Sequence, residues 1–290
     1  MKVALVVIGR LENRYAIEFV EYYKQLGIDN IFIIDNNFEN EEHFEDVLQV
    51  YIDEGFVKLI NKYRNVQGDI KNNIQIKAYK EIYNQISKDY DWIFYCDFDE
   101  YLAFKKDTNI KEYLSRDCFK NYNQILIHWK IYSDNGLVYD DGRPCLERFT
   151  VSTTNKRFKV NRWFNENQYV KPIIRTKIKD INICTNHNFT NELVDKTTCN
   201  NCGEKLENYS HNFTHPINYN LAYIKHFITK TIDEWINNKQ KKGVGDRSIE
   251  EFKNSYPIER FFRYNSITKE KIDFIKSKGY KYDMGKIYWF

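Results

Sequence analysis

The 290-residue sequence lacks any run of 18 apolar residues, so it offers no candidate for a membrane-spanning helix. The short apolar run near its start is not followed by the small-residue cleavage site of a signal peptide, and we expect the chain to stay in the cytoplasm. Its six cysteines are scattered, and in that compartment we expect reduced thiols and no disulfide framework. The formal net charge is only +3, which by itself indicates neither nucleic acid nor a membrane surface as a partner.

The residues that are present describe a globular protein rich in aromatic side chains. Hydrophobic residues make up 42 % of the chain, charged residues 29 % and aromatic residues 17 %. This length and composition suit one large α/β domain, or one domain with a C-terminal extension. Tyrosine has a stacking face and a hydroxyl group, so its abundance would suit a sugar or nucleotide site. A codon bias toward Tyr, Phe, Lys, Asn and Ile would produce the same excess.

Strands and helices alternate through the first hundred residues. Continuous apolar runs predict buried strands at 3–8, 31–34, 56–60 and 92–96, and apolar residues three or four apart predict helices over 11–26 and 70–86. This alternation predicts an α/β fold with a mostly parallel sheet flanked by helices. Further on we expect a strand at 124–132, an irregular polar stretch at 140–220 and a helix around 219–240.

Polar residues stand where three of these strands end: Arg10 after the first, Asp35 with Asn36 after the second, and Asp97 with Asp99 after the fourth. Ligands of parallel α/β sheets bind at the carboxyl ends of the strands. Mg²⁺ and Mn²⁺ take oxygen ligands and can bridge carboxylates to a departing diphosphate. The sequence therefore predicts a divalent cation at Asp97-Phe98-Asp99. A second Asp-x-Asp triplet, at 89–91, precedes its strand and is interpreted as a solvated turn.

At this motif the sequence becomes recognisable. Residues 92–102 (WIFYCDFDEYL) resemble the aspartate-motif strand of GT-A glycosyltransferases, in particular the group of family 92 and family 2-like enzymes. Shorter blocks resemble other parts of the same enzymes, at 12–23, 26–28, 33–36, 128–129, 135–136, 147–149, 171–175 with His187, and 226–235. The likeness touches most of residues 1–245 and is strongest before residue 136.

The resemblance implies a GT-A (Rossmann-like) fold and a nucleotide-sugar donor. It divides residues 1–245 into a nucleotide-binding half, 1–105, and an acceptor half, 106–245. Residues 246–290 would form a basic, aromatic and helical C-terminal extension.

The resemblance also implies roles for individual residues. Asp35 and Asn36 would contact the nucleoside, and Asp97 the ribose or the metal. Asp99 would ligate the metal directly, and His187 would complete the metal shell. The alternative for His187 is a loop histidine without a ligand role.

Five more residues are expected at the site. We expect Arg10, Glu12 and Gln75 to contact the donor, Arg10 by offsetting diphosphate charge. The chain is similar to inverting enzymes, which use a carboxylate to deprotonate the attacking acceptor hydroxyl. Glu147 is the first candidate for this base and Asp134 the second. A surface ion pair with the arginine next to it is the alternative for Glu147.

The function expected from these observations is metal-dependent transfer of a hexose, with galactose as first guess, from a UDP-sugar to a glycan or lipid-linked acceptor in surface polysaccharide synthesis. A sugar-phosphate nucleotidyltransferase is one alternative, but it would need a glycine-rich phosphate loop after the first strand, where only Gly9 is found. A non-catalytic carbohydrate-binding protein is another, and it would not need an acidic strand end.

Two further signals lie outside this reading. Cys199 and Cys202, with His211 and His215, have spacing that could hold a structural Zn²⁺, although unpaired loop residues are the simpler interpretation. Between residues 269 and 286 six lysines face three acidic residues, which would allow contact with the inner face of an anionic membrane. A solvated helix face is the alternative for that stretch.

Overall fold

The computed structural model describes residues 1–290 except 70, 154–164, 208, 211, 243–246 and 284–290. Its strands are β1 Val3–Gly9, β2 Asn30–Asp35, β3 Val57–Ile60, β4 Trp92–Tyr95, β5 Glu100–Phe104, β6 Gln124–Ile131, β7 Val170–Arg175, β8 Asn182–Thr185, β9 Asn188–Thr190, β10 Thr198–Asn200 and β11 Ala222–His226. Its helices are α1 Asn13–Gln25, α2 Glu45–Asp53, α3 Ile74–Ile86, α4 Ile110–Leu114, α5 Cys145–Arg148, α6 Glu192–Lys196, α7 Ile232–Glu234, α8 Gln240–Lys242, α9 Ile249–Ser255, α10 Ile258–Phe261 and α11 Lys269–Ser277.

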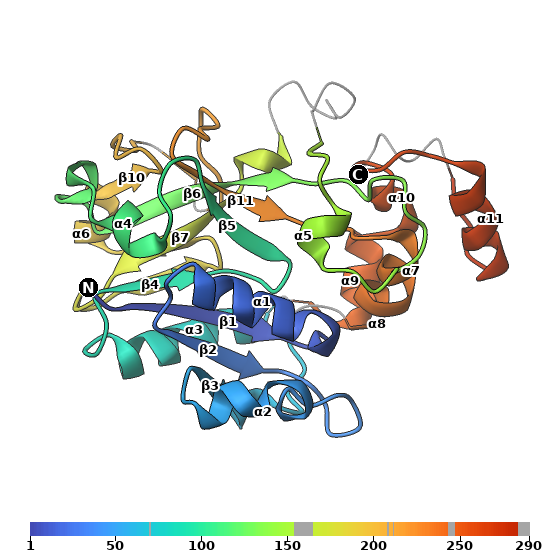
Figure 1. Cartoon of the computed structure of the whole chain (residues 1–290), viewed down its shortest axis with the longest axis horizontal. Helices are drawn as coiled ribbons and strands as arrows, with labels where there is room; N and C mark the ends of the chain where they lie inside the picture. The colour runs from blue at the N-terminus through green and yellow to red at the C-terminus, as the bar shows by residue number, and fades with distance from the viewer. Residues whose placement is uncertain (70, 154–164, 208, 211, 243–246, 284–290) are drawn as a thin grey trace.

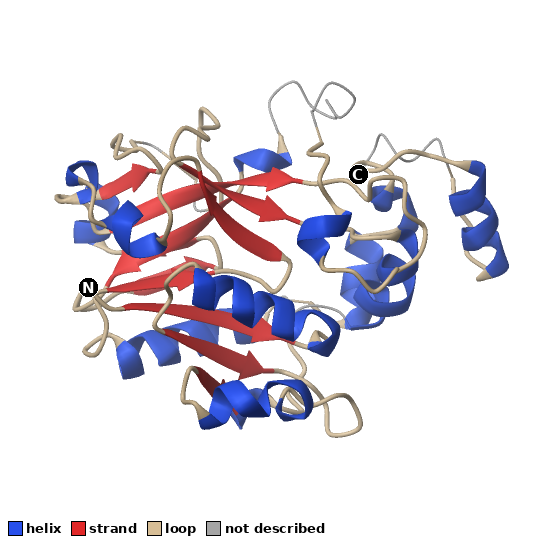
Figure 2. Cartoon of the chain, in the orientation of Figure 1, coloured by secondary structure: helices blue, strands red, loops and turns tan. Residues whose placement is uncertain are grey.

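Among the described residues, nine strands form one twisted sheet that runs through the molecule (Figure 2). Its order is β3-β2-β1-β4-β7-β6-β11-β5, and β10 also pairs with β6. The first four strands in this order are parallel, and so are β10 and β11 to β6. Only β7, against β4 and β6, and β5, against β11, add antiparallel pairs. The predicted α/β class with a mostly parallel sheet is therefore confirmed.

Helices cover both faces of the first four strands because those strands are apolar on both sides. In β1 the side chains of Val3, Leu5 and Val7 join the cluster that contains α1 and α2. The alternate side chains, Ala4 and Val6, join the cluster that contains α3. Because both faces of a central parallel strand are buried, its sequence is an unbroken apolar run.

The structure differs from the sequence reading in the second half of the chain. The helix expected around 219–240 is wrong for its first part, because 222–226 form β11, in which buried and half-buried residues alternate. The helical part begins after Thr231, whose hydroxyl caps the helix by accepting from the Glu234 backbone N–H. The stretch 140–220, expected to be irregular, contributes β7 and β10 to the central sheet.

The C-terminal part is helical, as expected, and α7 to α10 lie together at one end of the sheet (Figure 1). Trp235, Ile236, Phe261 and Ile275 belong to a hydrophobic cluster of their own, which holds residues from both sides of position 245. The division of the chain at that position stays a prediction. None of the described helices has the length and apolar character needed to cross a bilayer.

Candidate active site

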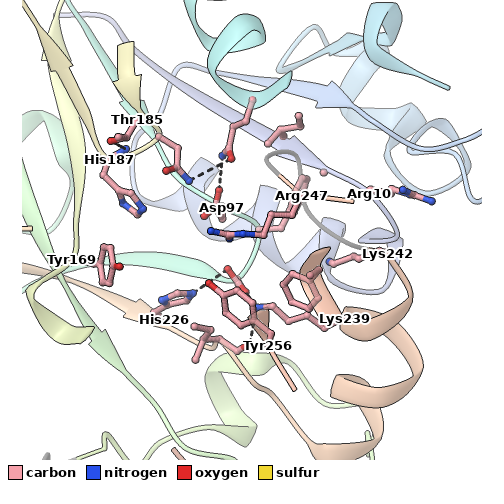
Figure 3. A pocket seen from close by; sticks show the side chains of 18 of the residues that line it. Arg10, Asp97, Tyr169, Thr185, His187, His226, Lys239, Lys242, Arg247 and Tyr256 are labelled. Atoms are coloured by element: carbon pink, nitrogen blue, oxygen red, sulfur yellow. Dashed lines mark hydrogen bonds and ion pairs between the residues drawn. The ribbon is translucent and has the colours of Figure 1, made fainter. Parts of the chain in front are cut away.

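A cavity of about 520 Å³ opens at the carboxyl ends of β1 and β4, between the sheet and the C-terminal helices (Figure 3). This volume is within the range of small-molecule sites in proteins. Seven of the residues expected from the sequence line it, namely Arg10, Glu12, Asn36, Gln75, Asp97, Asp99 and His187. Three others do not, namely Asp35, Asp134 and Glu147. With the exception of Asp35, the donor-site and metal-site candidates therefore line the cavity, and both candidate bases lie outside it.

The turn between β4 and β5 holds the two aspartates in place. Phe98 between them is 2 % exposed, and its ring centroid lies 4.7 Å from that of Phe19 and 5.3 Å from that of Phe44. A Cβ atom added to Gly9, at the end of β1, would meet the Phe98 ring at 2.5 Å. The middle residue of the motif is therefore buried against close neighbours, while the carboxylates of Asp97 and Asp99 line the cavity.

Asp97 forms an ion pair with a buried lysine, Lys171. Its carboxylate accepts hydrogen bonds from Lys171 Nζ at 2.6 Å and from Gln75 Nε2 at 3.0 Å. Burial acts to raise the pKa of Asp97, but the Lys171 ammonium outweighs it, and the pKa lies below its usual value. Lys171 also lies 3.4 Å from Glu100, which accepts from the Asp97 backbone N–H and whose pKa burial raises well above normal.

Asp99 has two basic neighbours in the cavity. Lys239 Nζ donates to one carboxylate oxygen at 2.8 Å, and His226 Nε2 lies 3.4 Å from the other. Burial acts to raise the pKa of Asp99, and Lys239 and His226 together hold it well below its ordinary value. Burial lowers the pKa of His226, which opposes the raising effect of the nearby Asp99 carboxylate.

The two residues expected to contact the nucleoside, Asp35 and Asn36, already have hydrogen-bond partners within the protein. Asp35 is fully buried, where it accepts from the backbone and side chain of Asn37 and from Arg64 Nε at 2.7 Å. Asn36 does line the cavity, and its amide donates to two backbone carbonyls at 2.9 Å each. Asp35 therefore supports the loop, and Asn36 is the one of the pair that a ligand can reach.

Arg10 lines the cavity but its guanidinium points away from the centre (Figure 3). It makes two hydrogen bonds to Glu41, at 2.8 and 2.6 Å, and lies 4.1 Å from the centroid of the Phe38 ring. Its charge is thus already matched, which argues against the expected role in offsetting diphosphate charge.

The two candidate bases are displaced for different reasons. Glu147 is exposed, because α5 buries Cys145 and Arg148 and turns Glu147 outward. Asp134 is 1 % exposed and forms an ion pair with the fully buried Lys271, which ties α11 to the loop after β6. The structure therefore gives neither carboxylate contact with the cavity.

One end of the cavity combines aromatic rings with an arginine. Tyr169, Phe252, Tyr256 and Arg260 line it, and the Phe252 and Tyr256 rings stack with centroids 4.6 Å apart. The Arg260 guanidinium lies 3.7 Å from the Tyr256 ring centroid. Glu166 lines the same end and pairs with Arg260 at 3.4 Å. Flat rings with hydrogen-bonding groups beside them suit a sugar ring.

Comparison with known proteins decides the class of enzyme. The model of "Glycosyltransferase family 92" matches residues 12–260. The chain belongs to this family. As a family-92 member it is a glycosyltransferase, which confirms the predicted enzyme class and GT-A type of fold. No curated protein matches its sequence.

Solved structures show only distant similarity to this glycosyltransferase. The crystal structure of S. aureus TarS is 11 % identical over 99 % of this chain and 46 % of its own, with a TM-score of 0.42. TarS 1–349 in complex with UDP-GlcNAc is 15 % identical over 60 % and 45 %, with a TM-score of 0.35. The mannosyltransferase PcManGT from Pyrobaculum calidifontis, in complex with GDP-Man and Mn²⁺, is 9 % identical over 44 % and 36 %, with a TM-score of 0.30. The family-92 chain thus spans less than half the length of each.

The side chains of this glycosyltransferase suit a divalent cation by their chemistry. Asp97 and Asp99 supply carboxylate oxygens, and His187 Nδ1 bonds the Val170 carbonyl at 2.8 Å, which leaves Nε2 as a possible metal ligand. Burial lowers the pKa of His187 to about 3, so the ring is neutral. Among the described residues, however, no three His, Cys, Asp or Glu side chains already converge on one point. The donor groups fit Mn²⁺ or Mg²⁺, but lysines now hold both aspartates.

The predicted zinc group can be followed only in part, because His211 lies outside the described residues. Cys199 is buried, and the Cys202 thiol lies 3.3 Å from Asn201 Oδ1. His215 Nδ1 bonds the Gln168 amide at 2.9 Å. The five cysteines whose side chains the structure describes are free thiols.

The sequence did not predict the three lysines of the site, Lys171, Lys239 and Lys242. Lys171 lies in one of the blocks that carry the family resemblance, but its place beneath Asp97 depends on β7 inserting next to β4. Lys239 and Lys242 come from the C-terminal helical part and meet Asp99 and Glu12. No local pattern marks these lysines, since their partners lie more than 70 residues away in the sequence.

Proposed function

We propose that the chain transfers a hexose from a UDP-sugar to a glycan or lipid-linked acceptor, as a step in surface polysaccharide synthesis. Family membership supports the glycosyltransferase part of this statement. The donor site is inferred from the position of Asp97 and Asp99 at the strand ends, in a cavity large enough for a nucleotide-sugar. Since the family consists of glycosyltransferases, the nucleotidyltransferase and the non-catalytic binding protein are not retained.

Within this proposal, Asn36 and Gln75 border the nucleoside side, and Asp97 lies at the ribose. Asp99, with His187, would hold a Mn²⁺ or Mg²⁺ ion. When bound, such an ion neutralises charge on the departing diphosphate. The aromatic end of the cavity, with Tyr169 and Tyr256, is where the acceptor sugar would lie.

The acceptor hydroxyl needs a base, and an inverting reaction, which we also propose, needs it across the sugar from the leaving group. Of the two carboxylates first considered, neither lines the cavity. Glu166 does, at the acceptor end, and it is 9 % exposed and paired with Arg260 and Arg263. Glu166 is therefore the better candidate for this role.

The test is calorimetric titration of UDP-galactose, UDP-glucose, UDP-GlcNAc and GDP-mannose, each with and without Mn²⁺. We expect one UDP-sugar to bind, with a gain in affinity from Mn²⁺ that Asp99→Asn removes. Asp89→Asn is the matched control, because Asp89 belongs to the other Asp-x-Asp triplet and is exposed before β4. Absence of binding by every donor, or an unchanged Mn²⁺ effect in Asp99→Asn, would refute the proposal.

A further inference from the structure

Two lysines on one short helical segment reach the cavity beside the aspartate motif. Lys239 and Lys242 both line the cavity, and Figure 3 shows them on the same side of it. Each is paired with a carboxylate that also lines the cavity, Lys239 with Asp99 at 2.8 Å and Lys242 with Glu12. These carboxylates come from the β4–β5 turn and from the start of α1, so the segment spans the mouth of the donor site.

The backbone of this segment is anchored, whereas its two lysine side chains reach out from it. Trp235 is fully buried and Ile236 is 3 % exposed, both in the C-terminal hydrophobic cluster. Residues Trp235–Lys239 form a π-helical turn, a rare conformation that is frequently found at functional sites. The side chains of Lys239 and Lys242 keep 16 % and 11 % exposure. A lysine offers three donors on a flexible stem, so it can change partners without movement of the backbone.

A diphosphate that enters this cavity meets carboxylates and needs cations. At 4 Å, two like unit charges repel by about 4 kcal/mol near a protein surface. Arg10 is occupied by Glu41, and Lys171 is fully buried beneath Asp97. Among the described residues that line the cavity, the lysines are Lys239 and Lys242, and two more arginines, Arg247 and Arg260, line it as well.

We infer that Lys239 and Lys242 bind the donor's diphosphate, and that Lys239 does so by leaving Asp99. This inference rests on the proposed function. In the empty site Lys239 neutralises Asp99; when the donor enters, the ammonium moves to a phosphate oxygen and the aspartate is released to bind a cation. His226, 3.4 Å from the other Asp99 oxygen, stays with the carboxylate and limits the cost of the exchange. Lys239 thereby couples donor entry to the availability of Asp99.

The first experiment titrates inorganic pyrophosphate into the full chain in EDTA, so that neither a nucleotide nor a metal is involved. We expect Lys239→Met and Lys242→Met each to weaken binding roughly 10- to 100-fold, the range of a charge-assisted hydrogen bond. Lys241→Met is the matched control, because Lys241 has the same charge on the same helix but is exposed and does not line the cavity. Equal affinities of Lys239→Met and Lys241→Met would overturn the inference, and so would failure of the wild type to bind pyrophosphate.

Asp99 variants distinguish a Lys239 that moves to the phosphate from a Lys239 that only neutralises Asp99. In Asp99→Asn the lysine has lost its competing carboxylate, and we expect pyrophosphate to bind more tightly, by roughly fivefold, the worth of one ordinary hydrogen bond. The double variant Lys239→Met/Asp99→Asn has no unpaired charge, which protects its fold, and should bind pyrophosphate more weakly than the wild type, because the ammonium that would meet the phosphate is missing. Wild-type affinity in the double variant would show that Lys239 serves only to neutralise Asp99.

A metal titration gives a third readout. If Lys239 competes for Asp99, Lys239→Met should bind Mn²⁺ alone more tightly than the wild type, by roughly tenfold. Unchanged or weaker Mn²⁺ binding would contradict the exchange. Neither titration uses a nucleotide-sugar, so failure of the proposed donor would not disturb these results. Conversely, a UDP-sugar that binds while pyrophosphate does not would leave the proposed function intact and remove this inference.

Discussion

Removal of the Lys171 charge should cost the fold stability with little change in shape. Its side chain is fully buried, with Nζ 2.6 Å from Asp97 and 3.4 Å from Glu100. Lys171→Met keeps most of the stem and deletes the charge. Removing one partner of a buried ion pair costs about 3–5 kcal/mol, because the other charge is left without compensation. The Asp97 side chain is 32 % exposed to the cavity, so water can reach it, and we expect a loss near the lower end, about 3 kcal/mol.

The assay is urea unfolding followed by tryptophan fluorescence. Lys196→Met is the matched control: Lys196 pairs with Glu192 one helical turn away, both side chains are exposed, and we expect little change in stability because water screens such a pair. The double variant Lys171→Met/Asp97→Asn should recover at least part of the loss, because it removes one of the uncompensated charges. A loss below about 1 kcal/mol in Lys171→Met would refute the argument that this lysine is a buried counter-ion.

Three further predictions follow from single residues. Burial lowers the pKa of His128 to about 4 from 6.5, so between these values only the unfolded chain binds the proton and stability falls as the pH decreases. Between pH 8 and pH 5, His128 should contribute roughly 2 kcal/mol to the stability lost in urea unfolding, so His128→Gln should reduce that loss by about this amount, and an equal loss in both proteins would contradict this. Gly203→Ala should lower the melting temperature, because φ is +79° at this position and the new Cβ would lie 2.5 Å from the Cys118 carbonyl oxygen. An unchanged melting temperature would contradict this close contact. Glu166→Gln should reduce kcat at least tenfold while Glu147→Gln leaves it within twofold, and the reverse order would restore Glu147 as the base.

The sequence was sufficient to find the parts of the site that depend on local pattern. Asp97 and Asp99 directly follow a continuous apolar strand, and parallel strands end at the same edge of a sheet, so their place could be inferred before any coordinates. The strands around them could be inferred for the same reason. Those residues face the cavity as expected, although their roles in binding stay predictions.

What the sequence did not show depends on contacts between distant segments. β7 was missed because Lys171 and Pro172 interrupt its apolar pattern, and Lys171 is buried only because Asp97 and Glu100 compensate its charge. The sequence predicts Glu147 as the catalytic base because it is the carboxylate of a short block that resembles the family. In the structure it is Arg148 that turns inward, to Glu234, and this choice is set by the packing of α5 against α7 and not by the motif.

The packing of Phe98 has a consequence for how the specificity of this enzyme can be altered. Its ring is wedged between Phe19, Phe44 and the backbone at Gly9, so the flanking carboxylates have little freedom to adjust to a differently shaped ligand. Tyr256 and Arg260, which have longer side chains and also line the cavity, form a second part of its wall. A library that aims to change the sugar or the acceptor should therefore randomise that wall and leave the aspartate turn untouched.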